Sequence, residues 1–234
     1  MNDKKHLLSY LVVIYEDNHL IAVNKPAGML VHGDNTGDDT LADAVKEYIK
    51  IRYEKPGEVF LGVVHRLDRP VSGVVVFART SKALARMNKL FQDKTISKKY
   101  LAIVDDRPHE LAARLTHYIL KDESKNIVKA YSSPKSGAKE AILDYVQKGE
   151  LNGKVLLEVQ PITGRPHQIR VQLSKIHCAI LGDLKYGAKY PLPDKSIGLH
   201  CKEMSFIHPV SKESLTITAT PPQGFPWDTF SYED

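Results

Sequence analysis

The sequence predicts an α+β fold with a mixed, mostly antiparallel sheet and flanking helices. Three observations favour this class. A chain of 234 residues that is 42% hydrophobic can bury a sizeable core. Short β-branched or alternating segments outnumber segments with helical spacing. The two kinds are not regularly interleaved, as they would be around a parallel sheet.

The expected elements follow from local periodicity and from the residues that bound each segment. Five short segments are bounded by Gly, Pro or Asp and are expected to be strands: 11–15, 20–23, 74–78, 100–104 and 155–159. Helical spacing occurs at 41–51, 82–91 and 167–176. Residues 33–39 and 122–139 are expected to be loops. We find no internal repeat, so one domain is the simplest organisation.

The charge balance suits a polyanionic partner without requiring one. Lys and Arg total 33 against 28 for Asp and Glu, which gives a formal charge of +5 and a pI near 9.0. The only cysteines, Cys178 and Cys201, form no C-x-x-C pair, which favours a reducing cytoplasm over a disulfide framework. No signal-peptide run and no stretch of about eighteen apolar residues occurs, so a soluble protein without membrane contact is expected.

The helix expected after Ser81, its candidate N-cap, has two distinct faces. Leu84, Met87 and Phe91 share an apolar face, which should pack in the core. The other face carries a basic stripe made of Lys82, Arg86 and Lys89. This stripe is either a nucleic-acid contact or a solvated helix face, and spacing alone leaves both open.

A loop dense in ionisable groups lies between two apolar segments in residues 62–77, with Asp68 at its centre. Pro70 and Gly73 punctuate the loop and can hold it in one shape, which a catalytic carboxylate requires. The alternative is a turn in which Asp68 accepts hydrogen bonds from its own backbone.

A second candidate site follows the strand that ends at Pro161. Thr163 is a candidate helix cap there, and Arg165 offers a planar fork suited to a carboxylate or phosphate. Ile169, Leu173 and Ile176 should form the core face of this helix, whereas His167, Arg170 and Ser174 lie together on a polar face. A purely structural cap is the alternative.

Metal and nucleotide cofactors are not expected. Two histidine pairs are candidate metal ligands, His65 with His167 and His200 with His208. The sequence contains no H-E-x-x-H motif and no tight ligand cluster, however. It also contains no Gly-rich phosphate loop.

Several ordered motifs together resemble the RluA-like pseudouridine synthase family. Residues 65–68 (HRLD) with Ser72-Gly73 look like its catalytic motif. Residues 24–28 (NKPAG) with 31–32, 98–102 (KKYLA) and 163–165 (TGR) with 167–170 (HQIR) resemble further family motifs in the same order. Gly182-Asp183, Tyr186-Gly187, Leu199-His200 and His208-Pro209 complete the set. The resemblance covers about residues 11–221.

The resemblance implies a pseudouridine synthase-like catalytic fold and an isomerisation of uridine in ribosomal or transfer RNA, without a cofactor. Asp68 is implied as the catalytic carboxylate, with Arg165 holding it and Tyr100 stacking on the base or moving a proton. The target base must be flipped out of its stack, and Arg66 is the candidate to fill the gap. The other residues expected to contact RNA are Lys25, His65, Lys82, Arg86, Lys89, Lys98, His167 and Arg170.

Two positions depart from the family pattern, since Val71 and Pro166 each stand where Thr is usual. These departures put substrate details in doubt more than the reaction. We expect a monomeric catalytic domain over residues 1–234, with no S4-type RNA-binding module before the first motif. The alternatives are a non-catalytic RNA-binding or chaperone protein, against which Asp68, Tyr100 and Arg165 argue, and an aspartate-dependent hydrolase, which would need a second carboxylate or Mg²⁺.

Overall fold

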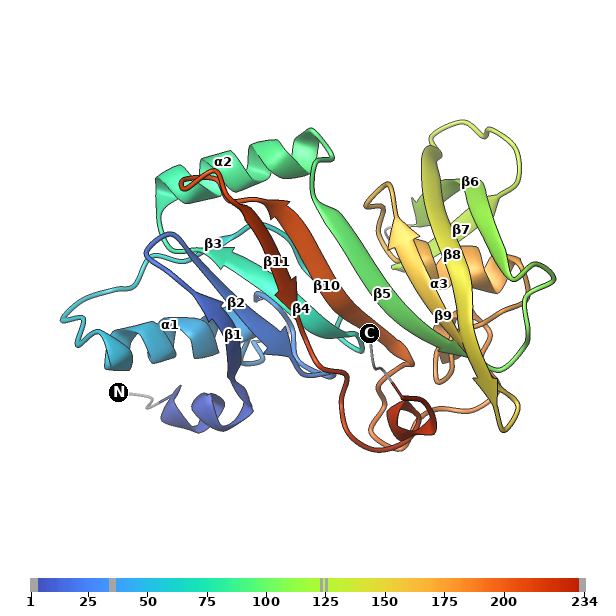
Figure 1. Ribbon diagram of the computed structural model, residues 1–234, viewed down its shortest axis with the longest axis horizontal. Helices are drawn as coiled ribbons and strands as arrows, with labels where there is room; N and C mark the ends of the chain where they lie inside the picture. The colour runs from blue at the N-terminus through green and yellow to red at the C-terminus, as the bar shows by residue number, and fades with distance from the viewer. Residues whose placement is uncertain (1–3, 34–36, 123, 125, 232–234) are drawn as a thin grey trace. The chain divides into compact units, whose positions relative to one another are not determined.

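The computed structural model describes residues 4–33, 37–122, 124 and 126–231. Its contacts divide the chain into two compact units. Unit 1 comprises Met1–Ile96 and Cys201–Pro221, and unit 2 comprises Ser97–His200 and Pro222–Asp234. Whether the two units act as one domain stays a prediction. The strand pairs whose register is described are all antiparallel, which confirms the expected α+β class (Figure 1).

Unit 1 is built on the antiparallel strands β1 (Val12–Glu16), β2 (Leu20–Lys25) and β4 (Ser72–Ala78). The short β3 (Gly62–Val63) pairs with β4, and β10 (Leu199–Ile207) pairs with β11 (Ser214–Thr218). Every residue of β4 is buried, which explains its continuous apolar sequence rather than an alternating one.

Two helices of unit 1 begin at threonine caps. Thr40 and Asp43 form a capping box at the start of α1 (Leu41–Arg52). In α2 (Ser81–Gln92) the N-cap is Thr80, whose hydroxyl accepts a hydrogen bond from the Ala83 amide at 3.1 Å, so the expected cap at Ser81 is wrong by one residue. The fully buried Met87 confirms that the apolar face of α2 packs in the core.

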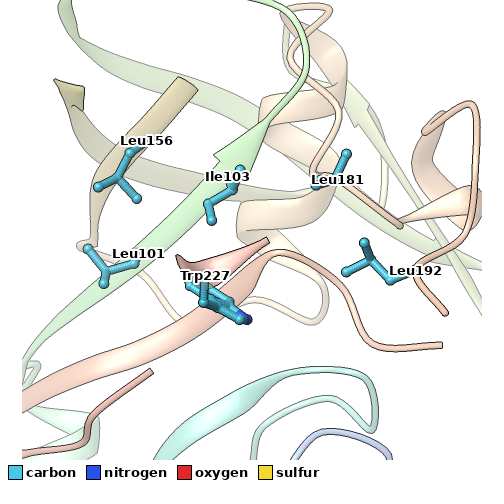
Figure 2. Close-up of a cluster of buried hydrophobic side chains, with 6 residues drawn as sticks. All are labelled: Leu101, Ile103, Leu156, Leu181, Leu192 and Trp227. Carbon is cyan, nitrogen blue, oxygen red and sulfur yellow. The ribbon is translucent and has the colours of Figure 1, made fainter. Parts of the chain in front are cut away.

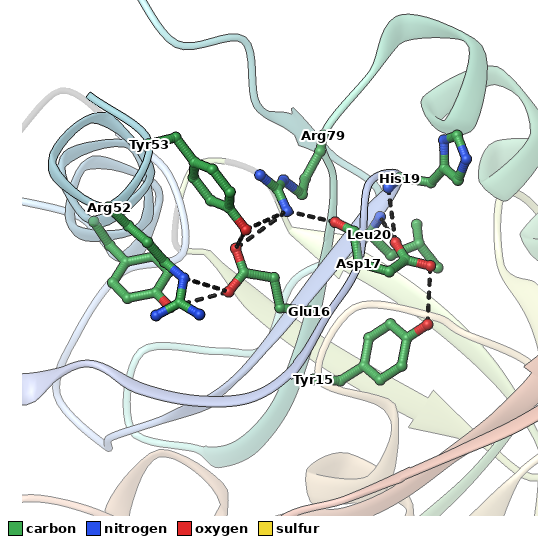
Figure 3. Close-up of polar contacts among 9 residues, drawn as sticks. Tyr15, Glu16, Asp17, His19, Leu20, Arg52, Tyr53 and Arg79 are labelled. Carbon is green, nitrogen blue, oxygen red and sulfur yellow. Dashed lines mark hydrogen bonds and ion pairs between the residues drawn. The ribbon is translucent and has the colours of Figure 1, made fainter. Parts of the chain in front are cut away.

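A polar cluster joins the end of β1 to the end of α1 and to the residue after β4 (Figure 3). The Glu16 carboxylate accepts a hydrogen bond from the Tyr53 hydroxyl at 2.8 Å and forms ion pairs with Arg79 at 3.1 Å and Arg52 at 3.4 Å. The Arg79 guanidinium also lies 4.5 Å from the centroid of the Tyr53 ring. These contacts fix the ends of three elements to one another.

Unit 2 is an antiparallel sheet in the order β5 (Ser97–Val104), β9 (Lys154–Pro161), β8 (Lys139–Leu151), β6 (Ala112–Asp122) and β7 (Ile127–Tyr131). Strand β7 lies inside residues 122–139, so the loop expected there is partly wrong. The β6 and β8 strands alternate in burial, and sequence analysis missed both because their outer positions carry mixed polar and apolar residues.

Two apolar clusters hold unit 2 together. In one, Trp227 packs with five leucine and isoleucine side chains: Leu101, Ile103, Leu156, Leu181 and Leu192 (Figure 2). In the other, side chains of β6, β7 and β8 meet Val171 of α3 (Gln168–Lys175) and Tyr186. Helix α3 therefore covers one face of the β6–β8 region, and the opposite face of these strands lies away from that cluster. None of the helices in the described part of the chain combines the length and apolarity needed to span a lipid bilayer.

Candidate active site

The loop that carries Asp68 runs from β3 to β4 in unit 1, as expected from the two apolar segments around it. A turn closes it, with the Val71 amide donating to the Asp68 carbonyl at 3.0 Å. Gly28 and Arg69 fasten it to the segment after β2: the Gly28 amide donates to the Arg69 carbonyl at 2.8 Å, and Arg69 Nε donates to the Gly28 carbonyl at 2.9 Å. The loop shape is thus held mainly through backbone groups.

Lys25 lies directly beneath this loop and is fully buried. Its ammonium donates to the carbonyls of Pro26 at 2.9 Å, Met29 at 2.7 Å and Arg69 at 3.1 Å. Three acceptors match the three N–H groups of an ammonium. Lys25 thus has a structural role in holding this loop, and its contact with RNA stays a prediction.

The electrostatics of Lys25 connect it to the candidate catalytic residue. Burial lowers the pKa of Lys25 to about 7, the Asp68 carboxylate acts in the opposite direction, and the Arg69 charge lowers the pKa further. The carbonyl acceptors favour the charged form. Lys25 therefore places a buried positive group within electrostatic reach of the partly buried Asp68.

Gly73 fixes the place where the Asp68 loop enters β4. Its φ is +116°, and a Cβ at this position would lie 2.3 Å from the carbonyl oxygen and 2.5 Å from the amide nitrogen of Cys201. Only glycine permits such an approach between the two backbones. Gly73 was expected only to shape the loop, whereas in the structure it also allows this close contact with β10.

The other expected residues of unit 1 lie in different surroundings. His65 Nε2 accepts a hydrogen bond from the Val76 amide at 2.9 Å, and its ring stacks on Phe91 with centroids 5.3 Å apart. Arg66 is exposed beside Asp68. In the stripe on α2, Lys82 and Lys89 are exposed, while Arg86 donates to the Pro209 carbonyl at 3.2 Å. RNA contacts by these residues stay predictions.

Unit 2 carries the remaining expected residues, with Tyr100 and Lys98 on β5 and Arg165 after β9. Tyr100 is partly buried and pairs with Val159. The Lys98 ammonium lies beside Gly164, 3.8 Å from where a Cβ would stand. Arg165 Nε donates to the Glu140 carbonyl at 2.9 Å, and the Arg165 amide donates to Gln168 Oε1 at 2.9 Å. The structure thus brings Lys98 and the Arg165 segment together.

The start of α3 differs from the expectation. Its N-cap is His167, with a left-handed φ of 51°, and Thr163 does not cap the helix. The Thr163 hydroxyl instead accepts from the Ile142 amide at 2.9 Å and donates to Gln168 Oε1 at 2.7 Å. The expected cap at Thr163 is wrong because a loop of several residues separates it from the helix, and its side chain ties that loop to β8.

Arg170 and His167 are held by the motif at residues 182–187. Arg170 is buried and forms a two-pronged ion pair with Asp183, at 2.7 Å and 2.9 Å, and its guanidinium lies 5.0 Å from the centroid of the Tyr186 ring. The Tyr186 hydroxyl lies 2.6 Å from His167 Nδ1 and accepts from the Val128 amide at 3.1 Å. The polar side chain of Arg170 is therefore buried and bound to Asp183, and its contact with RNA stays a prediction. Contact between His167 and RNA stays a prediction.

Cys178 and Cys201 are both buried, and burial raises the pKa of the Cys178 thiol to about 11. In the part of the chain that the structure describes, no three His, Cys, Asp or Glu side chains come together as a metal site.

Comparison with known proteins identifies the family. Residues 19–175 match the family model described as RNA pseudouridylate synthase. The chain is 33% identical over 229 residues to ribosomal large subunit pseudouridine synthase C of Buchnera aphidicola, covering 94% of this chain and 70% of that relative. It is also 33% identical over 234 residues to tRNA pseudouridine synthase C of Haemophilus influenzae, covering 89% of this chain and 92% of that relative.

A solved structure shares the fold. The structure titled Human RNA Pseudouridylate Synthase Domain Containing 4 superimposes with a TM-score of 0.76 at 26% identity, covering 91% of this chain and 89% of that one. Sequence motifs, family model and structure agree, which confirms the resemblance. The chain belongs to the RNA pseudouridylate synthase family as an RluA-like member, an isomerase that converts uridine to pseudouridine in RNA.

Proposed function

We propose that this protein isomerises uridines of ribosomal or transfer RNA, with the Asp68 carboxylate as its catalytic group. The main support for this catalytic role is the arrangement of residues around Asp68. A loop held by backbone hydrogen bonds carries Asp68, and the buried Lys25 side chain donates a hydrogen bond to the Arg69 carbonyl of that loop. Relatives named for each class of RNA support the choice of substrate.

The proposed reaction needs no second substrate. The bond between N1 of uracil and C1′ of ribose breaks, the base turns, and a bond forms between C5 and C1′. The proton on C5 leaves to solvent and N1 gains a proton, so atoms and electrons balance. Asp68 serves this exchange as nucleophile or as base. Tyr100 stacks on the base or moves the proton, and Arg165 holds the carboxylate.

Arg165 is suited to that role by its anchoring. Its Nε is bound to the Glu140 carbonyl, which orients the plane of the guanidinium and leaves the two terminal nitrogens to address an anion. The protein is proposed to act as a monomer in the cytoplasm. The sequence contains only two cysteines and no C-x-x-C pair, which favours a reducing compartment.

Release of tritium from RNA labelled at C5 of uridine tests the proposal. Transcripts of large-subunit ribosomal RNA and of transfer RNA are supplied separately, so that turnover of one assigns the substrate class. Asp68→Asn should abolish release while its circular dichroism and its RNA affinity match those of the wild type. Asp228→Asn, which changes an exposed carboxylate of unit 2, serves as the control and should release tritium normally.

Three results would contradict the proposal. Appreciable release by the Asn variant would remove Asp68 from the chemistry. Appearance of free uracil in place of pseudouridine would identify a hydrolase instead. If the wild-type protein acts on neither transcript, these two RNA classes are not its substrates.

A further inference from the structure

The outer face of the β6–β7 hairpin in unit 2 combines aromatic rings with positive charges. Burial along the strands defines this face. His117 and Ile119 of β6 and Val128 of β7 are buried, and the latter two pack in the cluster with α3. Because neighbouring residues of a strand point to opposite faces, Tyr118 and Leu120 of β6 lie on the other side, as do Lys129 and Tyr131 of β7.

Strand register places the two tyrosines side by side. Tyr118 pairs with Tyr131 of β7 on one side and with Glu140 of β8 on the other, and Leu120 pairs with Lys129. Tyr118 and Tyr131 are partly exposed. Directly paired residues of antiparallel strands hold their Cβ atoms about 4.5–5.5 Å apart, so the two tyrosines occupy adjacent positions on this face.

Cations flank this surface. The Lys135 ammonium lies 4.2 Å from the centroid of the Tyr131 ring, and Lys129 is exposed in the next outward position of the same strand. At the other end of the row, Arg165 donates to the Glu140 carbonyl. Glu140 and Asp122 are acidic side chains near this face, and Asp122 accepts hydrogen bonds from the amide and the hydroxyl of Ser124. We name Tyr118, Leu120, Lys129, Tyr131 and Lys135 the hairpin platform.

We propose that the hairpin platform binds single-stranded nucleotides of the RNA substrate that flank the target uridine. Tyrosine rings stack on unpaired bases, and lysines beside the rings meet the phosphates between those bases. A protein partner is less suited, because charged groups interrupt the apolar surface on each side of the rings. Arg165 at the edge of the row connects the platform to the segment assigned to the reaction. The inference rests on the RNA substrate of the proposed function.

Fluorescence anisotropy with a fluorescein-labelled oligouridylate of about twelve nucleotides tests the platform. Tyr118→Leu combined with Tyr131→Leu keeps apolar bulk but removes the rings, and it should weaken binding about five- to one-hundred-fold. Lys135→Gln should lower the slope of affinity against salt by about 0.7, the value for one phosphate of a single strand. Circular dichroism checks the fold of each variant. Because Lys135 lies outside the strands, its variant tests the platform even where the double variant misfolds.

Matched controls separate specific from general effects. Tyr190→Leu changes a tyrosine of unit 2 that is 77% exposed, and Lys148→Gln changes an exposed lysine of β8. Both should bind the oligouridylate as the wild type does. An RNA duplex of equal length should bind the double Leu variant almost as well as it binds the wild type, because its bases are already stacked.

The outcomes decide between the possibilities. Unchanged binding of the oligouridylate by a folded double Leu variant would overturn the assignment, as would an unchanged salt slope for Lys135→Gln. Either result would favour a protein partner for this face. Equal losses for single strand and duplex would overturn base stacking. Tritium release by the wild type is measured in parallel, so a failure of the platform is distinguishable from a failure of the proposed function.

Discussion

Gly73→Ala should destabilise unit 1 far more than Gly28→Ala, although both glycines have positive φ and both lie beside the Asp68 loop. The φ values are +116° for Gly73 and +86° for Gly28. An added Cβ at Gly28 meets nothing within 4 Å, whereas at Gly73 it meets the Cys201 backbone at 2.3 Å. The pair therefore separates conformational strain from steric conflict.

The magnitudes follow from these two terms. A left-handed conformation costs an L-residue about 1–2 kcal/mol, which both variants bear. Ordinary contact with Cβ begins at 3.4 Å, so at Gly73 the two backbones must separate by 3.4 minus 2.3, about 1.1 Å. Overpacking costs about 1–3 kcal/mol, and here a paired strand rather than a flexible side chain must move. We expect losses of about 2–5 kcal/mol for Gly73→Ala and about 1–2 kcal/mol for Gly28→Ala.

Urea unfolding followed by circular dichroism measures both losses. Single-turnover tritium release at a temperature where both variants are folded shows whether the displacement reaches Asp68, and Gly73→Ala should be the slower variant. Losses that agree within about 0.5 kcal/mol would refute the steric argument, since strain alone would then explain both.

Three further predictions concern charged groups. Replacing Lys82, Arg86 and Lys89 with Gln should reduce the salt slope of RNA binding by about 0.7–0.9 for each phosphate that the stripe neutralises, mostly through the two exposed lysines, and an unchanged slope would identify the stripe as a solvated face. Arg165→Ala should lower the single-turnover rate with little change in RNA affinity, and Arg165→Lys should restore only part of that rate; a fully active Lys variant beside an Ala variant impaired only in binding would contradict this role. Burial acts to raise the pKa of Asp17, but hydrogen bonds from the Leu20 and His19 amides and the Tyr15 hydroxyl outweigh it and hold the pKa below its usual value. The ionised Asp17 therefore stabilises the fold above that usual value, and the contribution is lost as pH falls through the lowered pKa, so Asp17→Asn should flatten the decline of Tm below about pH 4.

The amino-acid sequence was enough to predict the elements with strong local periodicity and the family. The strands at β1, β2, β4, β5 and β9 and all three α-helices were predicted within a few residues. Their patterns depend on which side of one element is buried, and that information is local. The family motifs are likewise short runs of adjacent residues, which can be recognised without knowing where they lie in the folded protein.

The contacts of the charged side chains in those motifs could be seen only in the folded protein. Lys25 and Arg170 look like surface cations in the sequence, but one binds carbonyls from two segments and the other pairs with Asp183, thirteen positions away. The pairing of residues across the β6–β7 hairpin could not be predicted from the sequence either, because the register that places Tyr118 opposite Tyr131 depends on hydrogen bonds between the strands. The same charged or aromatic residue type can be solvated or buried. Which partner it contacts depends on distances in the folded chain, and the order of residues in the sequence does not specify those distances.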